Sequence, residues 1–135
     1  MPNENTFGGG RILVVEDDLL VVAELVDTLH SMGADVVGPI VSIEKALERL
    51  ERLNGIVGAV LDVNVQGQMV FPLADELSRR NVPYVFSSGY DDSVVPARYA
   101  GIRRFSKPVD EREIAAALLD AIAGSAPPIQ RRSAS

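Results

Sequence analysis

The stretch GAVLDVNVQG (residues 58–67) places an acid directly after an apolar run. Ala59, Val60 and Leu61 are typical of a strand that is buried on both faces, which is the usual state of strands in a parallel sheet covered by helices. Asp62 follows this run without a break. A carboxylate at the end of a buried strand indicates that the strand emerges into a polar crevice, and other strands should end there too.

Strand-like and helix-like segments alternate along the rest of the chain. The pattern of apolar residues and turn residues predicts strands over 11–15, 35–41, 56–62, 82–88 and 102–106. Helices are predicted over 19–32, after an N-cap at Ser42, over 70–80, over 91–100 and after an N-cap at Asp110. Gly38-Pro39 makes the second strand a weak or edge strand. This alternation predicts an α/β fold, a doubly wound five-stranded parallel sheet with helices on both faces.

The chain of 135 residues fits one domain. We expect a flexible N-terminal segment at 1–10, the domain at 11–123 and a disordered tail at 124–135, which is rich in Ser, Pro and Ala. This tail is too short for an output domain. The chain has no secretory signal and no apolar stretch of the roughly 20 residues that a membrane span needs, so we expect it in the cytoplasm.

Composition excludes several classes of site. The chain has no Cys and a single His, which excludes disulfides, thiolate sites and multi-histidine metal sites. Its formal net charge of −6 argues against nucleic acid as a direct partner, because no excess of basic residues exists to replace counterions.

Polar side chains follow the predicted strands on one edge of the sheet. Glu16, Asp17 and Asp18 follow the first strand, Asp62 ends the third, Ser87 and Ser88 end the fourth, and Lys107 follows the fifth. Ligands of such open sheets bind outside the carboxyl ends of the strands. Carboxylates that meet there repel one another and need a cation, and oxygen ligands without Cys or His favour Mg²⁺.

These groups together suit phosphoryl transfer. Asp62 would be the nucleophile, as in aspartyl-phosphate chemistry, while the metal and Lys107 would neutralise charge on the phosphoryl oxygens and Ser88 would donate a hydroxyl. Singly, each element has a simpler explanation, such as an N-cap or a turn. Their order, with each at a strand end, favours the functional interpretation.

Four segments, RILVVEDD, AVLDVNV, PYVFSSGY and RFSKPVD, resemble the signature segments of the response-regulator receiver domain. The resemblance covers residues 11–123 and implies a flavodoxin-like fold with strand order 2-1-3-4-5. It implies that Glu16 and Asp17 are the acidic metal pair and that Asp62 is the phosphoacceptor. It also implies that Asn64 offers its backbone carbonyl to Mg²⁺, Ser88 is the switch hydroxyl and Lys107 is the site lysine.

Two features depart from or narrow this resemblance. Receivers usually carry an aromatic switch residue three positions before the lysine, where this chain has Arg104. One hypothesis is that Tyr90 takes over this part. The segment PYVFSSGY is similar to a subgroup of stand-alone alphaproteobacterial receivers with the pattern F-[AS]-[TS]-G-Y, some of which are served by histidine kinases of the HWE type.

The resemblance implies a single-domain response regulator in a two-component phosphorelay. Its partners would be a sensor histidine kinase or a histidine phosphotransfer protein, and a downstream protein. It would be a monomer or a weak homodimer through the face of the fourth helix, fifth strand and fifth helix. We do not expect the protein to be an enzyme. It would be a phosphoacceptor that catalyses only its own phosphorylation and slow dephosphorylation.

Other functions stay open at this point. The chain could be a phosphate sink or an unphosphorylated scaffold. A flavodoxin-like module that binds a small molecule is disfavoured, because Asn64 stands where the cobalamin-binding loop has its histidine. An aspartyl-phosphate hydrolase is disfavoured for a similar reason, because such enzymes carry a second acid at that position.

Overall fold

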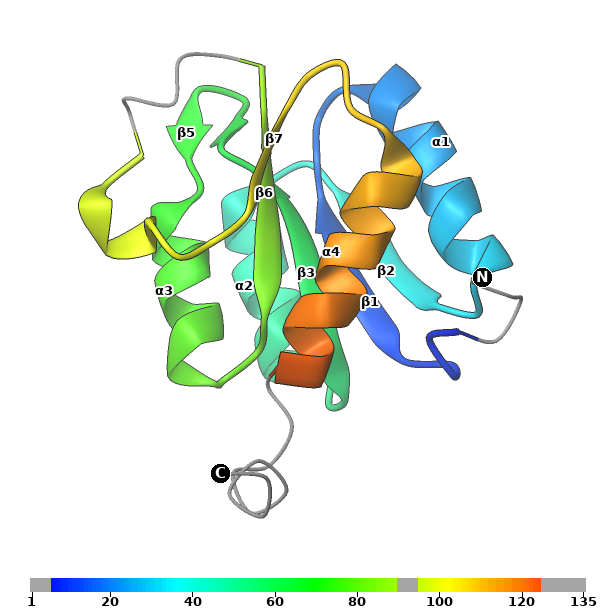
Figure 1. Cartoon of the computed structure of the whole chain (residues 1–135). Coiled ribbons are helices and arrows are strands. Elements are labelled where there is room, and N and C mark those ends of the chain that lie inside the picture. The colour runs from blue at the N-terminus through cyan, green and yellow to red at the C-terminus, as the bar shows by residue number, and fades with distance from the viewer. Residues whose placement is uncertain (1–5, 90–94, 125–135) are drawn as a thin grey trace.

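A parallel β-sheet forms the middle layer of the computed structural model, which describes residues 6–89 and 95–124 (Figure 1). Its strands are β1 (Arg11–Val15), β2 (Asp35–Ile40), β3 (Ile56–Asp62), β6 (Tyr84–Ser88) and β7 (Arg104–Ser106). The order across the sheet is β2-β1-β3-β6-β7, and every pairing is parallel. The predicted order 2-1-3-4-5 is confirmed, since β4 and β5 form a separate hairpin.

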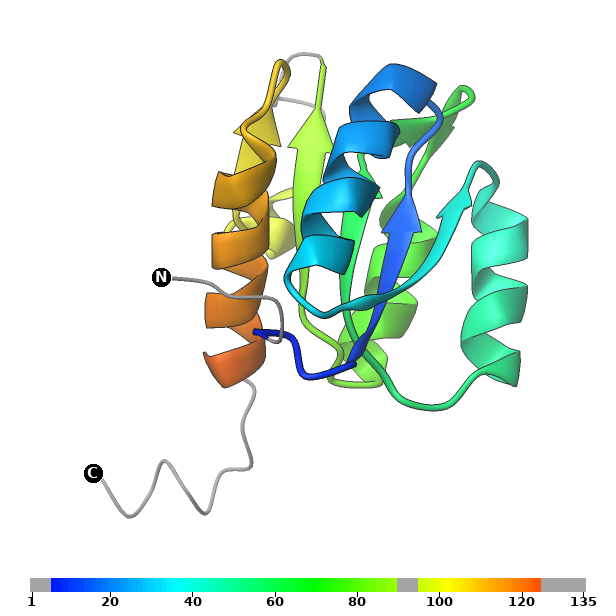
Figure 2. The same cartoon turned by 90° about the vertical axis from the view of Figure 1, so that its right-hand side faces the viewer.

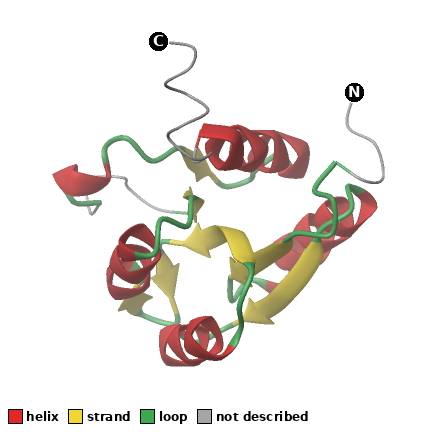
Figure 3. Ribbon diagram, turned by 90° about the horizontal axis from the view of Figure 1, so that it is seen from below, coloured by secondary structure: helices red, strands yellow, loops and turns green. Residues whose placement is uncertain are grey.

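Among the described residues, two α-helices cover each face of the sheet. Figure 2 shows α1 (Leu19–Ser31) beside α4 (Glu111–Gly124) on one face. The helices α2 (Ile43–Arg52) and α3 (Phe71–Arg79) lie on the other face, and the view in Figure 3 shows the sheet between the helix layers. The prediction of a doubly wound sheet is therefore confirmed.

The strand period of two divides the core into two clusters. Along β1, Leu13 and Val15 pack toward α2 and α3, whereas Ile12 and Val14 pack toward α1 and α4. The strands β3 and β6 alternate in the same way. All four of these β1 side chains are fully buried, which explains why the central strands are continuous apolar runs.

Side-chain caps fix the first residue of three helices. They thereby also fix the last residue of the loop that precedes each helix at the carboxyl edge of the sheet. The carboxylate of Asp18 accepts from the backbone N–H groups of Leu20 and Val21 at the start of α1. Ser42 accepts from Lys45 at the start of α2, as predicted. Asp110 accepts from Arg112 at 2.9 Å, so the predicted cap of α4 is also present.

The prediction of a helix over 91–100 is wrong for residues 95–100, which are the part that the structure describes. Residues 90–94 lie outside the described residues, and the chain from 95 to 100 forms only a 3₁₀ turn, η2 (Ala97–Tyr99). Pro96 precedes this turn in an extended conformation, and Tyr99 is buried against Phe71 and Phe86. Packing of one aromatic ring, rather than a helical face, therefore fixes the position of η2.

Both chain ends have defined structure in their described parts. Residues 6–10, expected within the flexible segment, form turns in which Phe7 donates to Met32 O and Gly9 to Gly33 O, each at 2.7 Å. The Phe7 ring packs partly buried against the core between α1 and α4. At the other end α4 extends through Gly124, and the remainder of the expected tail lies outside the described residues.

The two outer strands of the sheet are irregular or short. β2 carries Pro39, and its pairing with β1 shifts register between Leu13 and Val15. β7 has three residues, and Arg104 in it is exposed. Within the described ranges, no helix has the length and apolar character needed to cross a membrane.

We predict that Tyr99→Ala lowers the free energy of unfolding by about 3–4 kcal/mol, because it removes a buried ring that stacks on Phe71. Tyr99→Phe keeps the ring and loses only hydroxyl bonds to Asp75 and to Phe71 O, so it should cost about 1 kcal/mol. Denaturant unfolding measures both. The control is Leu20→Ala, at a side chain that is 85% exposed; equal effects at positions 99 and 20 would contradict the assigned packing.

Candidate functional site

A polar cleft of about 560 Å³ opens at the carboxyl edge of the sheet, the upper end in Figure 1. The loops after β1, β3, β6 and β7 all contribute to it. Its lining residues are Asp17, Asp18, Asp62, Asn64, Gln66, Gly67, Gly89 and Lys107. The convergence of strand ends predicted from the sequence is thus present in the structure.

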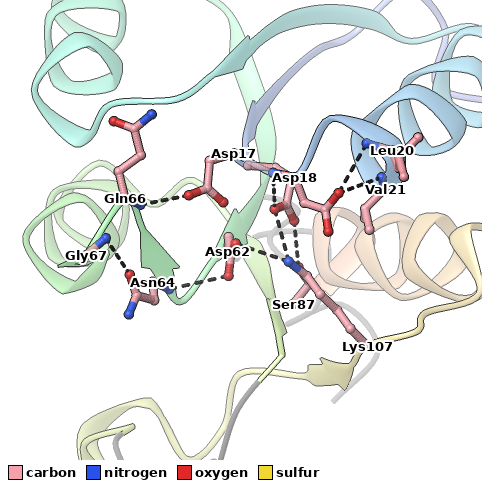
Figure 4. Close-up of polar contacts among 11 residues, drawn as sticks. Asp17, Asp18, Leu20, Val21, Asp62, Asn64, Gln66, Gly67, Ser87 and Lys107 are labelled. Carbon is pink, nitrogen blue, oxygen red and sulfur yellow. Dashed lines mark hydrogen bonds and ion pairs between the residues drawn. The ribbon is translucent and has the colours of Figure 1, made fainter.

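The Lys107 ammonium joins two buried carboxylates (Figure 4). Its Nζ atom donates to Glu16 Oε2 at 3.0 Å and to Asp62 Oδ2 at 3.2 Å. Glu16 is 2% exposed and Asp62 is 5% exposed, so water screens these contacts little. The backbone N–H of Lys107 donates to Ser88 O at 2.8 Å, which fixes the loop after β7 to the end of β6.

Burial and charge shift two pKa values in this cluster. Burial, followed by the hydrogen bond and charge of Glu16, raises the pKa of Asp62 to about 7, against the opposing effect of Lys107. Burial alone would lower the pKa of Lys107, but its bonds to Glu16 and Asp62 outweigh burial and raise it. Lys107 therefore stays an ammonium, and Asp62 is a carboxyl group whose charge needs further neutralisation.

Three acids gather beside this ion pair. Glu16, Asp17 and Asp62 each offer one carboxylate oxygen, and these three oxygens lie within 4.8 Å of one another. An all-oxygen set with adjacent carboxylates suits a hard divalent cation. The donor chemistry therefore fits the Mg²⁺ expected from the sequence, with Asn64 directly beside the cluster.

Backbone and hydroxyl donors hold these carboxylates in place. The N–H of Asp18 donates to Glu16 Oε2 at 3.0 Å, and the Ser87 hydroxyl approaches Glu16 Oε1 at 3.4 Å. The N–H of Asn64 donates to Asp62 Oδ1 at 3.3 Å. Two of these donors, in Ser87 and Asn64, belong to strands, and the third, in Asp18, is the N-cap of α1, so the strand ends and the start of α1 determine where the acids point.

A hairpin that we did not predict completes the cleft. β4 (Asn64–Val65) and β5 (Gln68–Met69) pair antiparallel, and the N–H of Gln66 at their turn donates to Asp17 Oδ2 at 2.9 Å. The turn residue Gly67 lines the cleft as well. A Gln-Gly pair between short polar–apolar alternations is a hairpin signal, although it is weaker than Asn-Gly.

Comparison with known proteins gives structural relatives along nearly the whole chain. A solution structure of SdrG from Pseudomonas melonis Fr1, in its BeF3-activated conformation, is 33% identical with a TM-score of 0.67, and the match covers 88% of this chain and 99% of SdrG. The chain belongs to the response-regulator receiver domains. The expected family is therefore confirmed.

Two further receiver domains show the same fold. The receiver domain of a modulated diguanylate cyclase from Desulfovibrio desulfuricans G20 is 24% identical with a TM-score of 0.75, covering 87% of this chain and 96% of its own. A CheY-like receiver domain from Methanospirillum hungatei JF-1 is 17% identical with a TM-score of 0.69, covering 87% and 96%. No sequence-family model and no curated protein matches the chain.

The predicted site residues of this receiver domain fall into three groups. Glu16, Asp17, Asp62 and Lys107 converge, with Asn64 adjacent. Ser88 is buried at the end of β6 and is not among the residues that line the cleft, although its neighbour Gly89 is. Tyr90 lies outside the described residues.

The position of the usual aromatic switch carries no aromatic ring in this receiver domain. Arg104 is exposed on β7, as its charge requires. The next residue, Phe105, is half-buried and packs toward α1 and α4, with the Arg103 guanidinium 5.2 Å from its ring centre. The departure noted in the sequence therefore persists in the structure.

We predict that Asp62→Asn raises the free energy of unfolding in the presence of EDTA by about 1–2 kcal/mol, because a neutral isostere removes the repulsion between two buried carboxylates. Thermal unfolding in EDTA measures the change. Asp75→Asn is the control, since Asp75 pairs with Arg98 at 3.1 Å and should gain nothing. A lower melting temperature for Asp62→Asn than for wild type would contradict the electrostatic description of the site.

Proposed function

We propose that this receiver domain accepts a phosphoryl group on Asp62 from a phosphohistidine, in a reaction that requires Mg²⁺. One observation carries the proposal: the Lys107 ammonium lies 3.2 Å from Asp62 Oδ2, beside three acids whose oxygens lie within 4.8 Å of one another. A carboxylate nucleophile next to a fixed ammonium and a site for a divalent cation suits phosphoryl transfer.

The proposed step exchanges one bond to phosphorus for another. A carboxylate oxygen of Asp62 attacks the phosphorus, an O–P bond forms, and the N–P bond of the phosphohistidine breaks. The electron pair of that bond returns to the imidazole nitrogen. The Lys107 ammonium stabilises negative charge on the phosphoryl oxygens because it already faces Asp62.

A divalent cation would be held by the carboxylates of Glu16, Asp17 and Asp62 and by the backbone carbonyl of Asn64. When bound, it supplies positive charge that lets three carboxylates and a phosphoryl group approach one another. Burial of Asp62 and Glu16 makes this compensation more valuable than it would be in water.

Phosphorylation would be read through the end of β6. A phosphoryl group adds a charge of about −1.5 to −2, which competes with Glu16 for the Lys107 ammonium. Lys107 is bonded through its N–H to Ser88 O, so a shift of the lysine or of the Ser88 hydroxyl would change how β6 and β7 end. A protein partner could then recognise the surface formed by η2, β7 and α4. This surface corresponds to the expected face of the fourth helix, fifth strand and fifth helix, with η2 in place of the fourth helix.

The partners we propose are a sensor histidine kinase, of the HWE type or another, or a histidine phosphotransfer protein, together with a downstream protein or a second, weakly bound copy. The likeness to SdrG in its BeF3-activated conformation supports phosphorylation-dependent signalling. Under this proposal the protein catalyses its own phosphorylation and slow dephosphorylation and turns over no other substrate.

The test is labelling with radioactive acetyl phosphate in the presence of Mg²⁺. Wild type should take up label, and the label incorporated by Asp62→Asn should be at least about 100-fold lower, since the nucleophile is gone. Lys107→Met should also lose labelling, because the ammonium that stabilises phosphoryl charge is absent. Addition of EDTA should abolish labelling of wild type.

Asp75→Asn serves as the matched acid control, because Asp75 pairs with Arg98 and is not among the residues that line the cleft. It should keep wild-type labelling. Label that survives on Asp62→Asn would place the acceptor elsewhere, and label that survives EDTA would remove the metal from the proposal.

A further inference from the structure

The hairpin of β4 and β5 has a two-residue turn in a left-handed conformation. Gln66 has φ of 52° and Gly67 has φ of 83°. Positive φ at both central residues is typical of the tight hairpin turn whose twist matches that of its strands. Gly accepts this conformation readily, but a residue with a side chain such as Gln66 does so at a cost. The rest of the structure must therefore stabilise the turn.

The base of this hairpin is fixed to the core. Val63, Val65 and Val70 are each at most 2% exposed. The N–H of Val63 donates to Ser87 O at 3.0 Å, and the N–H of Val70 donates to Val63 O at 2.9 Å. The hairpin consequently has a defined position relative to β6 and to Asp62.

The tip of the hairpin contacts the acidic cluster. The Gln66 N–H donates to Asp17 Oδ2, and the Gly67 N–H donates to Asn64 Oδ1, both at 2.9 Å (Figure 4). The first bond joins residues 49 positions apart in sequence. Both contacts depend on the left-handed turn, since it directs these two N–H groups.

Asp17 differs from the other two acids of the cluster in what holds it. Lys107 binds Glu16 and Asp62, but among residues 6–89 and 95–124 no ion pair to Asp17 is found. Asp17, like Glu16, belongs to the loop after β1, but Glu16 is buried and bonded to Lys107. The orientation of Asp17 therefore depends on the hydrogen bond from Gln66.

We propose that the β4–β5 hairpin is a positioning element that orients the Asp17 carboxylate for a divalent cation and thereby sets the affinity of the cleft for Mg²⁺. This inference rests on the cation site of the proposed function. Hydrogen bonds to ligating carboxylates fix their orientation, and their loss typically costs about 10–100-fold in metal affinity. Asp17 Oδ2 accepts the Gln66 N–H, so the second carboxylate oxygen would be the one available to a cation.

The sharpest test compares two substitutions of Gly67. Apart from Gly67 and its two chain neighbours, no atom of the described residues lies within 4 Å of the position that a Cβ at Gly67 would take, so a side chain meets no steric clash there. Asn tolerates the left-handed conformation, whereas β-branched Val strongly disfavours it. Gly67→Asn and Gly67→Val therefore differ mainly in whether the turn, and with it the bond to Asp17, persists.

Isothermal titration of each folded variant with Mg²⁺ alone measures the dissociation constant. We expect Gly67→Val to bind about 10-fold more weakly than wild type and Gly67→Asn to stay within about threefold. Thermal unfolding in EDTA confirms that both variants fold, and Gly67→Ala replaces the Val variant if that one does not. Equal affinities for the Asn variant and the β-branched or Ala variant would overturn the inference.

The same titration separates this inference from the proposed function. Wild type that binds no Mg²⁺, or an Asp17→Asn variant that binds as tightly as wild type, would remove the cation site itself. If wild type binds Mg²⁺ through Asp17 but the two Gly67 variants have equal affinity, only the positioning role of the hairpin is excluded.

Discussion

The ion pair that joins Lys107 to Glu16 and Asp62 is the constraint on which the carboxyl edge of this protein depends. Two carboxylates from neighbouring strands are buried within reach of one ammonium, and each would repel the other without it. Lys107 follows β7, at one edge of the sheet, whereas Glu16 follows β1. Lys107 can contact both acids only if β6 and β7 pair in the observed register and the backbone of Lys107 bonds to Ser88 O, so the site depends on correct assembly of this half of the sheet.

One cation does not balance this cluster. Asp17 adds a third carboxylate, and the pKa of Asp62 rises to about 7 largely because burial disfavours its charge. Such a site lies away from the stability optimum, as sites built for chemistry commonly do. Under the proposed function this imbalance has a use, because a divalent cation and then a phosphoryl group would enter surroundings already arranged for them.

Sequence patterns predicted the sheet and most of the site because they depend on local, periodic signals. The strand predicted over 56–62 matches β3 at both ends, and Asp17, Asp18, Asp62 and Lys107 line the cleft. The failures have a common cause. Tyr99, Phe7 and Gln66 take their positions from partners distant in sequence, namely Phe71, Met32 and Asp17, and no local period encodes those contacts.

The outer strands of the sheet restrict how this protein can associate. An exposed edge strand can template a strand from another molecule, and proteins oppose this with proline, charge, short length and irregular register. Here Pro39 and the register shift interrupt the edge strand β2, while the other edge strand, β7, has only three residues and carries Arg104. Continuation of the sheet into a neighbouring molecule is thereby disfavoured. Under the proposed function, partners would therefore dock on helices and loops, the parts of the surface whose shape phosphorylation of Asp62 would alter.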